Sequence, residues 1–175
     1  MTLALKSLLL VATLGLAACN NPDRYGAGGP GGAGGAGGAG GVDTTGLGDP
    51  SNPTSIAYFN QRVGDRVLFL VDQSTLTPEG RTVLTGQAQW LTTNAGYAAI
   101  IEGHADEQGT REYNLALGAR RAAAVQNFLI SQGVPANRLR TISYGKERPL
   151  EVCSEEACYA KNRRAVTVLS VGAGA

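Results

Sequence analysis

A glycine-rich stretch near the start of the chain limits where a folded domain can lie. Thirteen of the 25 glycines fall between Gly26 and Gly48, mostly as Gly-Gly-Ala repeats. Glycine loses more backbone freedom on ordering than any other residue and brings no side chain to a core. Residues 19–54 are therefore predicted to form a disordered, flexible tether. From about Ser55 the composition is that of a globular protein, and residues 55–173 are enough for one domain.

The segment before the tether has the layout of a secretory signal peptide. Lys6 supplies a positive charge, and the apolar run after it is too short to span a membrane comfortably. A buried N-terminal helix is the alternative, but no partner element follows it. Residues 1–18 lead into LAAC, which resembles the bacterial lipobox, whose cysteine carries acyl chains after cleavage. Lipidation at Cys19 is therefore predicted. Asn20, where an aspartate would favour the inner membrane, points to the outer membrane, with the domain facing the periplasm.

The charge balance argues against nucleic acid as a partner. The chain carries 15 basic and 14 acidic residues, and removal of residues 1–18 takes away Lys6 alone, which leaves 14 of each. A chain with no net charge has no bulk electrostatic attraction to nucleic acid or to an anionic lipid surface.

Apolar runs and helical periodicity alternate through the domain. Short β-prone runs predict strands, and apolar residues at helical spacing between capping residues predict helices. In chain order we expect a strand over 65–72, a helix over 78–93, a strand over 97–106, a helix over 111–132, a strand over 138–145, a short helix over 154–162 and a strand over 163–171. A small edge strand over 57–63 is also expected. This alternation predicts an α/β sandwich with both long helices on one face of the sheet.

Arg121 occupies an unusual place in the second predicted helix. Helical periodicity puts it at the centre of the apolar stripe, between Leu117 and Val125. One interpretation is a structural ion pair with an acid of the chain itself. The other is a ligand carboxylate, because the guanidinium fork suits such a group and one internal acid does not use all of its five donors.

Asp106 is the acid that the sequence places nearest to Arg121. It follows the second strand in a loop with Gly109, and this loop leads into the N-terminal end of the helix, where free backbone N–H groups favour anions. A zwitterion would suit this arrangement, with its ammonium group on Asp106 and its carboxylate on Arg121.

Three stretches resemble a known family. GHADEQGTREYNLALGARRAAAVQNFLISQGV (103–134), YGKERP (144–149) and NRRAV (162–166) are similar to the OmpA-like peptidoglycan-binding domain, in the form of its lipoprotein branch. The resemblance covers about residues 66–170 and implies a βαβαβ(α)β domain with a mixed sheet. It also implies that Asp106 and Arg121 hold diaminopimelate of the peptidoglycan stem peptide, whose side chain ends in both ammonium and carboxylate. A TolB-like periplasmic protein is the protein partner that the family implies, together with a role in envelope constriction at division.

The family's groove is also bordered by the loop after the first strand, which makes three residues candidates here: Asp72, Ser74 and Leu76. Leu70 departs from the family, because an aspartate is common at that position. Asn114 matches the family's Tyr-Asn pair, and its role is either ligand contact or a structural hydrogen bond. Arg163 is expected to tie the last strand to neighbouring acids, with the groove within its reach.

The remaining reactive residues do not form a catalytic or metal-binding set. His104 is the only histidine, and no nucleophile motif lies near it in the sequence, so we expect a hydrogen-bonding role. Cys153 and Cys158 are expected to form a disulfide in an oxidising compartment, with a metal pair as the alternative. No cofactor, metal or catalytic residue is expected.

These observations leave three functions open. The first is a tether that grips the cell wall without covalent bonds and without catalysis. The second is a periplasmic cell-wall hydrolase with Asp106 or Glu102 as its general acid. The third is a structural hub in which Arg121 is neutralised inside the fold.

Overall fold

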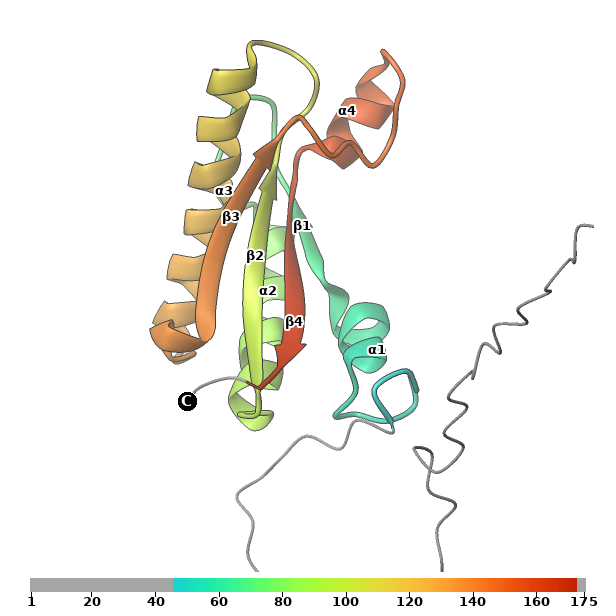
Figure 1. Cartoon of the computed structure of the whole chain (residues 1–175), viewed down its shortest axis with the longest axis vertical. Helices are drawn as coiled ribbons and strands as arrows, with labels where there is room; N and C mark the ends of the chain where they lie inside the picture. Colours follow the sequence, from blue (N-terminus) through green and yellow to red (C-terminus); the bar gives the residue numbers. More distant parts are fainter. Residues whose placement is uncertain (1–45, 173–175) are drawn as a thin grey trace, which may run out of the picture. The chain divides into compact units, whose positions relative to one another are not determined.

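The computed structural model describes residues 46–172, so the predicted signal peptide, Cys19 and most of the predicted tether lie outside the described residues. Figure 1 shows the described elements in the colours of the chain. In chain order they are α1 (Ile56–Tyr58), the π-helical turn η3 (Phe59–Gly64), β1 (Arg66–Leu68), α2 (Pro78–Thr93), β2 (Tyr97–His104), α3 (Arg111–Ser131), the 3₁₀ turn η4 (Ala136–Arg138), β3 (Leu139–Gly145), α4 (Glu156–Asn162) and β4 (Arg164–Val171).

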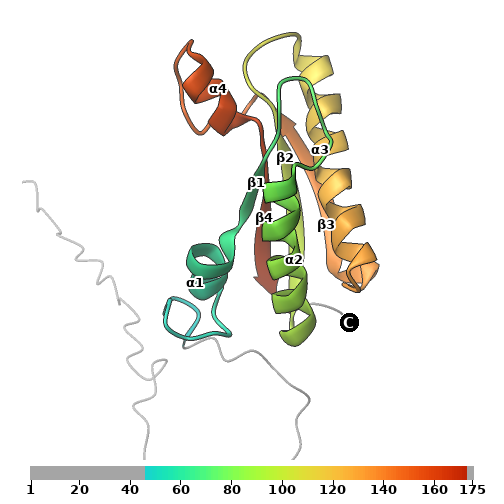
Figure 2. The ribbon, with the colours of Figure 1, turned by 180° about the vertical axis from the view of Figure 1, so that it is seen from behind.

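The four strands form one mixed sheet with the order β1-β4-β2-β3. β4 runs antiparallel to both of its neighbours, whereas β2 and β3 are parallel and are joined through α3. Figures 1 and 2, which view the domain from opposite sides, place α2 and α3 on the same face of the sheet. The predicted α/β sandwich with a mixed sheet and helices on one face is confirmed.

The alternation of side chains along the strands explains why the helices cover only one face of the sheet. In β2, Tyr97, Ala99 and Ile101 are buried toward the helices, whereas Ile100 is exposed on the other face. α3 approaches β2 very closely, because the helix and the strand both have glycine where they cross. A Cβ atom on Gly103 would overlap the carbonyl oxygen of Gly118. The close contact sets the height of α3 over the carboxyl end of β2.

Both long helices begin as the sequence predicts. The hydroxyl of Thr77 accepts a hydrogen bond from Gly80 N at 3.0 Å at the start of α2, and Thr110 accepts one from Tyr113 N at 3.2 Å at the start of α3. The caps fix the first turn of each helix, and the cap of α3 lies in the loop that carries Asp106.

An aromatic cluster closes the end of the core next to α1. The ring centroids of Phe59 and Tyr97 each lie 5.0 Å from that of Trp90. Trp90 Nε1 donates a hydrogen bond to the carbonyl of Pro53 at 2.8 Å, and Tyr97 Oη donates one to Thr54 at 2.7 Å. The residues just before Ser55, which the sequence assigns to the tether, therefore pack on the domain.

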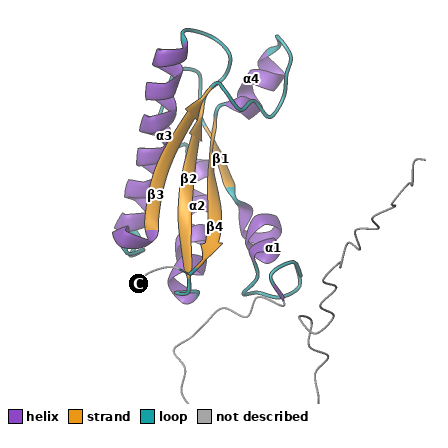
Figure 3. Ribbon diagram, viewed as in Figure 1, coloured by secondary structure: helices purple, strands orange, loops and turns teal. Residues whose placement is uncertain are grey.

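The expected edge strand over 57–63 is wrong, because this segment is helical. Ser55 Oγ accepts a hydrogen bond from Tyr58 N at 2.9 Å and starts α1. Helical spacing brings Phe59 and Val63 to one face, where Phe59 is buried and Val63 packs against the core. A strand would have placed Gln61 on the same face as this pair, but Gln61 is exposed. Figure 3 shows the helical turn directly before β1.

The first long strand, expected over 65–72, is also shorter than predicted. β1 pairs with β4 over three residues, from Arg66 to Leu68. The chain then turns, with Gln73 N donating to Leu70 O at 3.2 Å and Asp72 in the left-handed region at a φ of 57°. Leu70 and Val71, which look like strand residues in the sequence, are exposed in this turn. Backbone carbonyls of the segment after β1 accept hydrogen bonds from Arg121 and Arg163, two arginines of the candidate site.

Candidate functional site

The predicted site residues gather around the carboxyl end of β2. A cavity of about 260 Å³ lies there between the loop after β1, the loop after β2 and the first turns of α3. Its lining residues are Val71, Asp72, Asp106, Gln108, Gly109, Tyr113, Asn114 and Leu117. Three predicted residues, Asp72, Asp106 and Asn114, therefore share one cavity. Ser74, Leu76, Arg121 and Arg163 are not among the lining residues.

Arg121 is fully buried beneath this region and binds the backbone instead of an acid. Its Nε donates to Gln73 O at 2.8 Å, its Nη1 to His104 O at 2.8 Å and its Nη2 to Leu70 O at 3.1 Å. The side chain thus joins the loop after β1 to the end of β2. Two of the five N–H groups of the guanidinium are left over by these three bonds.

The charge of Arg121 has no direct counterion. None of the ion pairs found among residues 46–172 includes Arg121. The guanidinium carbon lies 5.2 Å from the ring centroid of Phe69, a cation–π contact that offsets part of the burial cost. Burial lowers the pKa of Arg121 to about 10, although the negative charge of Asp106 acts in the opposite direction. Arg121 therefore stays charged at neutral pH, and the structural ion pair considered above is absent from the described residues.

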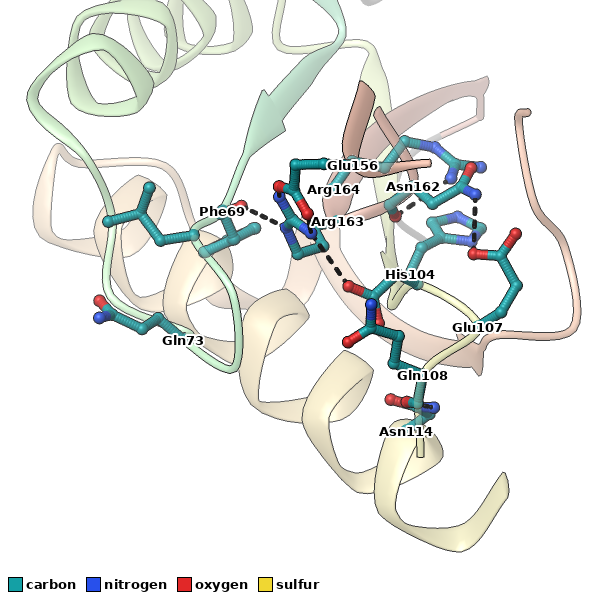
Figure 4. Close-up of polar contacts among 12 residues, drawn as sticks. Phe69, Gln73, His104, Glu107, Gln108, Asn114, Glu156, Asn162, Arg163 and Arg164 are labelled. Atoms are coloured by element: carbon teal, nitrogen blue, oxygen red, sulfur yellow. Dashed lines mark hydrogen bonds and ion pairs between the residues drawn. The ribbon is translucent and has the colours of Figure 1, made fainter. Parts of the chain in front are cut away.

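Asp106 pairs with Arg163, not with Arg121. Arg163 Nη1 lies 3.1 Å from Asp106 Oδ2. The same guanidinium binds Glu156 of α4 through both terminal nitrogens, and its Nε donates to Phe69 O at 3.3 Å. Figure 4 shows Arg163 between Phe69 and Glu156. Arg163 thus ties the last strand to neighbouring acids, and it also reaches the acid of the candidate site.

The three candidate residues in the loop after β1 have different surroundings. The carboxylate of Asp72 accepts a hydrogen bond from Tyr113 Oη, which connects this loop to the first turn of α3. Ser74 is half-buried and Leu76 packs against the hydrophobic core. Of the three residues named from the family, Asp72 is the one that faces the cavity.

Asn114 is a buried side chain with one free acceptor. Its Nδ2 donates to Gln108 O at 2.7 Å, which holds the loop after β2. Its Oδ1 is buried and has no hydrogen-bond partner among the described residues. A buried amide oxygen without a donor is costly, and a ligand that brings an N–H group would satisfy it.

His104 is buried as a neutral ring. Burial lowers the pKa of His104 to about 4, and the positive charges of Arg164 and Arg148 act in the same direction. Neither ring nitrogen has a hydrogen-bond partner within residues 46–172, so the expected hydrogen-bonding role is wrong. Nε2 lies 3.7 Å from a carboxylate oxygen of Glu102, too far for a hydrogen bond. The same residues contain no group of three or more side chains placed to hold a metal ion.

Cys153 and Cys158 form a disulfide whose Cα atoms lie 6.0 Å apart. The bridge closes a short loop that includes Glu156 and the first turn of α4. Asn162 secures the other end of this segment, since its Oδ1 accepts hydrogen bonds from Leu150 N at 2.7 Å and from Glu151 N at 3.1 Å. The covalent and the polar clamp together fix α4 beside Arg163.

A larger cavity of about 560 Å³ lies away from these groups, between α2 and the chain before β1. Tyr58, Val63, Val83 and Trp90 supply much of its lining, and Arg62 is the one charged residue in it. It brings together no set of groups for chemistry or for recognition of a charged ligand. The smaller cavity beside Asp106 is therefore the better candidate.

Sequence reasoning missed Glu156 and the carbonyl groups that bind Arg121. Carbonyls carry no signature in a sequence, because every residue has one. For Glu156 a signal was present: an acid in the first turn of a short helix that ends directly before Arg163.

Comparisons with known proteins agree on one family. The model of the OmpA family matches residues 68–163. A peptidoglycan-associated lipoprotein of Mesorhizobium japonicum is 56% identical over 124 residues, which is 71% of this chain and 73% of that protein. A peptidoglycan-associated lipoprotein of Rhizobium meliloti is 49% identical over 170 residues, or 95% of this chain and 88% of that protein.

Solved structures show the same fold. The crystal structure of the peptidoglycan-associated lipoprotein from Burkholderia pseudomallei matches with a TM-score of 0.62 and 36% identity, and the match covers 70% of this chain and 100% of that one. The C-terminal domain of Helicobacter pylori MotB matches with a TM-score of 0.58 at 22% identity, over 62% of this chain and 86% of that one, and so supports the fold alone.

Proposed function

Because the chain belongs to the OmpA family, and within it to the peptidoglycan-associated lipoproteins, we propose that it binds peptidoglycan without covalent bonds and tethers the outer membrane to the cell wall. The ligand is the side-chain end of diaminopimelate in the stem peptide, where an ammonium and a carboxylate sit on one carbon. The protein binds this group and does not cleave the wall.

The observation that carries the proposal is the uncompensated charge of Arg121. A buried guanidinium whose hydrogen bonds all go to carbonyls keeps a net positive charge in a region of low dielectric. An arriving carboxylate would neutralise this charge and would form charge-assisted hydrogen bonds with the fork. A neutral or purely cationic ligand would not neutralise this charge.

The loop after β1 must open for this contact. Arg121 has no exposed surface, and two of its three partners, Leu70 O and Gln73 O, belong to that loop. The tip of the loop is held by polar contacts more than by packing, because the exposed Leu70 and Val71 bury little apolar area. A ligand carboxylate would replace the two loop carbonyls, whereas the bond to His104 O, at the end of β2, would stay.

Asp106 would receive the ammonium group. Arg163 occupies its Oδ2, and no described residue donates a hydrogen bond to its Oδ1. Asn114 lines the same cavity, and its free acceptor would receive an N–H group of the stem peptide. The first turns of α3, with their free backbone N–H groups, favour the negative end of the ligand.

The anchor and the protein partner complete the proposal. Acyl chains on Cys19 would hold the chain in the outer membrane, and the glycine-rich segment between Cys19 and the described domain would let the domain search the layer below it. Anchoring confines this search, so modest single-site affinity is enough when many copies act together. A TolB-like periplasmic protein would bind near the same face, in the Tol–Pal system of envelope integrity and cell division. In the part of the chain that the structure describes, no helix is long and apolar enough to cross a membrane.

Co-sedimentation with purified sacculi tests this function. Wild-type protein should sediment with the sacculi, and Asp106→Asn, which removes the charge that faces the ammonium group, should stay in the supernatant. Soluble fragments are measured in the same tubes. Release of muropeptides by the wild-type protein would support the hydrolase instead, and equal sedimentation of both proteins would contradict the proposed role of Asp106.

A further inference from the structure

Arg163 lies at the junction of three segments that are distant in the sequence. It follows α4 directly, and its side chain contacts the loop after β1, the loop after β2 and the first turn of α4. The side chain is 5% exposed, and that of its partner Asp106 is 10% exposed. The other partner, Glu156, is on the solvent side with 67% of its side chain exposed.

The guanidinium of Arg163 binds two carboxylates, those of Asp106 and Glu156. Nη1 contacts both Asp106, at 3.1 Å, and Glu156, at 3.4 Å, whereas Nη2 binds Glu156 alone. A guanidinium fork that meets a single carboxylate tends to bind both of its oxygens. Here Nη2 donates to Glu156 and makes no hydrogen bond to the second oxygen of Asp106. Asp106 lines the cavity, and its Oδ1 accepts no hydrogen bond from the described residues.

Two restraints hold Glu156 in place. α4 has seven residues, too few for a stable helix on its own. The Cys153–Cys158 disulfide closes the loop that contains Glu156, and Asn162 Nδ2 donates to Glu151 O at 2.8 Å at the other end of the segment. Burial opposes the charge of Arg163, but its hydrogen bonds to Glu156 and Asp106 raise the pKa of Arg163 above the ordinary value.

We propose that Glu156, fixed by the Cys153–Cys158 disulfide, is a positioning residue that acts through Arg163 to keep one oxygen of Asp106 free for the ammonium group of the ligand. This inference rests on the proposed function. It assigns a role in recognition to α4 and to the disulfide, neither of which lines the cavity.

The test measures the affinity of the purified full chain for a muramyl tripeptide that ends in meso-diaminopimelate. Glu156→Ala should weaken binding roughly fivefold, since Arg163 then turns onto both oxygens of Asp106 and competes with the ligand. Glu155→Ala is the matched control. It removes the same charge from the neighbouring residue, whose side chain makes no capping bond, and should change the dissociation constant by less than about twofold. Cys153→Ser/Cys158→Ser should weaken binding in the same direction as Glu156→Ala.

A second ligand separates positioning from general loss of structure. When the side-chain amine of diaminopimelate is acetylated, the ligand no longer needs a free Asp106 oxygen, so wild type and Glu156→Ala should bind it equally well. Unchanged affinity of Glu156→Ala for the natural tripeptide, or equal weakening for both ligands, would overturn the inference. Wild-type affinity in the double serine variant would overturn the part assigned to the disulfide. If wild type itself fails to bind the tripeptide, the proposed function fails, and this inference fails with it.

Discussion

Replacement of Arg121 by methionine should cost both stability and binding, for separable reasons. Methionine keeps the unbranched stem and fills similar space, but it removes the charge and all donors. The three carbonyls that the guanidinium satisfies stay in place, because they belong to the backbone. This differs from a buried ion pair, where both partners can be replaced together by apolar groups without loss.

The expected loss in the free energy of unfolding depends on how deeply each carbonyl is buried. His104 O is buried, so losing its donor costs about 2 kcal/mol. Gln73 and Leu70 are exposed loop residues whose carbonyls can bind water, at about 0.5 kcal/mol each. The free energy of unfolding should therefore fall by about 3 kcal/mol, which corresponds to a melting temperature lower by roughly 10 °C for a domain of this size.

Urea unfolding followed by Trp90 fluorescence measures the stability, and sacculus co-sedimentation below the unfolding transition measures the binding. Arg138→Met is the matched control. Arg138 is also buried and also binds carbonyls, with Nε 2.7 Å from Tyr97 O and Nη2 3.0 Å from Asn94 O. These carbonyls lie at the start of β2, whereas Arg121 binds its end, roughly 23 Å away along the strand. Both variants should lose stability, but Arg121→Met alone should lose sacculus binding.

Three results would refute this reasoning. If Arg121→Met is as stable as wild type, the carbonyl contacts do not hold the loop after β1. If it still sediments with sacculi, Arg121 does not bind the ligand. If Arg138→Met loses binding equally, the loss reflects instability and not a missing contact.

Three further predictions test separate parts of the account. Gly103→Ala should lower the free energy of unfolding by about 2 kcal/mol or more in urea titrations, because its Cβ would overlap the backbone of Gly118; a neutral effect would mean that α3 can move away from β2. The unfolded state binds more protons than the folded state between pH 6.5 and about 4, since the pKa of His104 is lowered to about 4 in the fold, so stability should be lost as the pH falls through this range. The loss attributable to His104 should be at most about 3 kcal/mol and should disappear in His104→Phe, whereas identical pH profiles would contradict a buried neutral ring. Cys19→Ser should abolish lipid labelling and outer-membrane fractionation, and a lipidated variant would contradict the anchor.

The sequence predicted the long elements well because their signals are local. Capping residues such as Thr77 and Thr110 start α2 and α3 as expected. The prediction for residues 57–63 was wrong, since a short apolar run fits a strand or a helix equally well. The chain after Leu68 misled for another reason. Its apolar residues look like a continued strand, but the backbone leaves the sheet to bring carbonyls to Arg121.

Three of the predicted site residues, Asp72, Asp106 and Asn114, line one cavity, but the sequence did not predict which groups pair there. Periodicity places Arg121 on the inner face of α3, and the loop after β2 places Asp106 nearby, yet neither signal identifies partners. In the structure Asp106 pairs with Arg163, and Arg121 donates its hydrogen bonds to backbone carbonyls. Such contacts depend on the register of strands and loops that are far apart in the sequence, which spacing along the chain does not encode.

The most direct test of the account compares two stem peptides that differ by one group. Lysine is diaminopimelate without the side-chain carboxylate, so muramyl tripeptides ending in meso-diaminopimelate or in lysine offer the same ammonium group to Asp106. If the carboxylate completes Arg121, calorimetric titration of the purified chain should show at least about tenfold tighter binding of the diaminopimelate peptide, the value of one charge-assisted contact. Equal affinity for the two peptides would contradict the central claim.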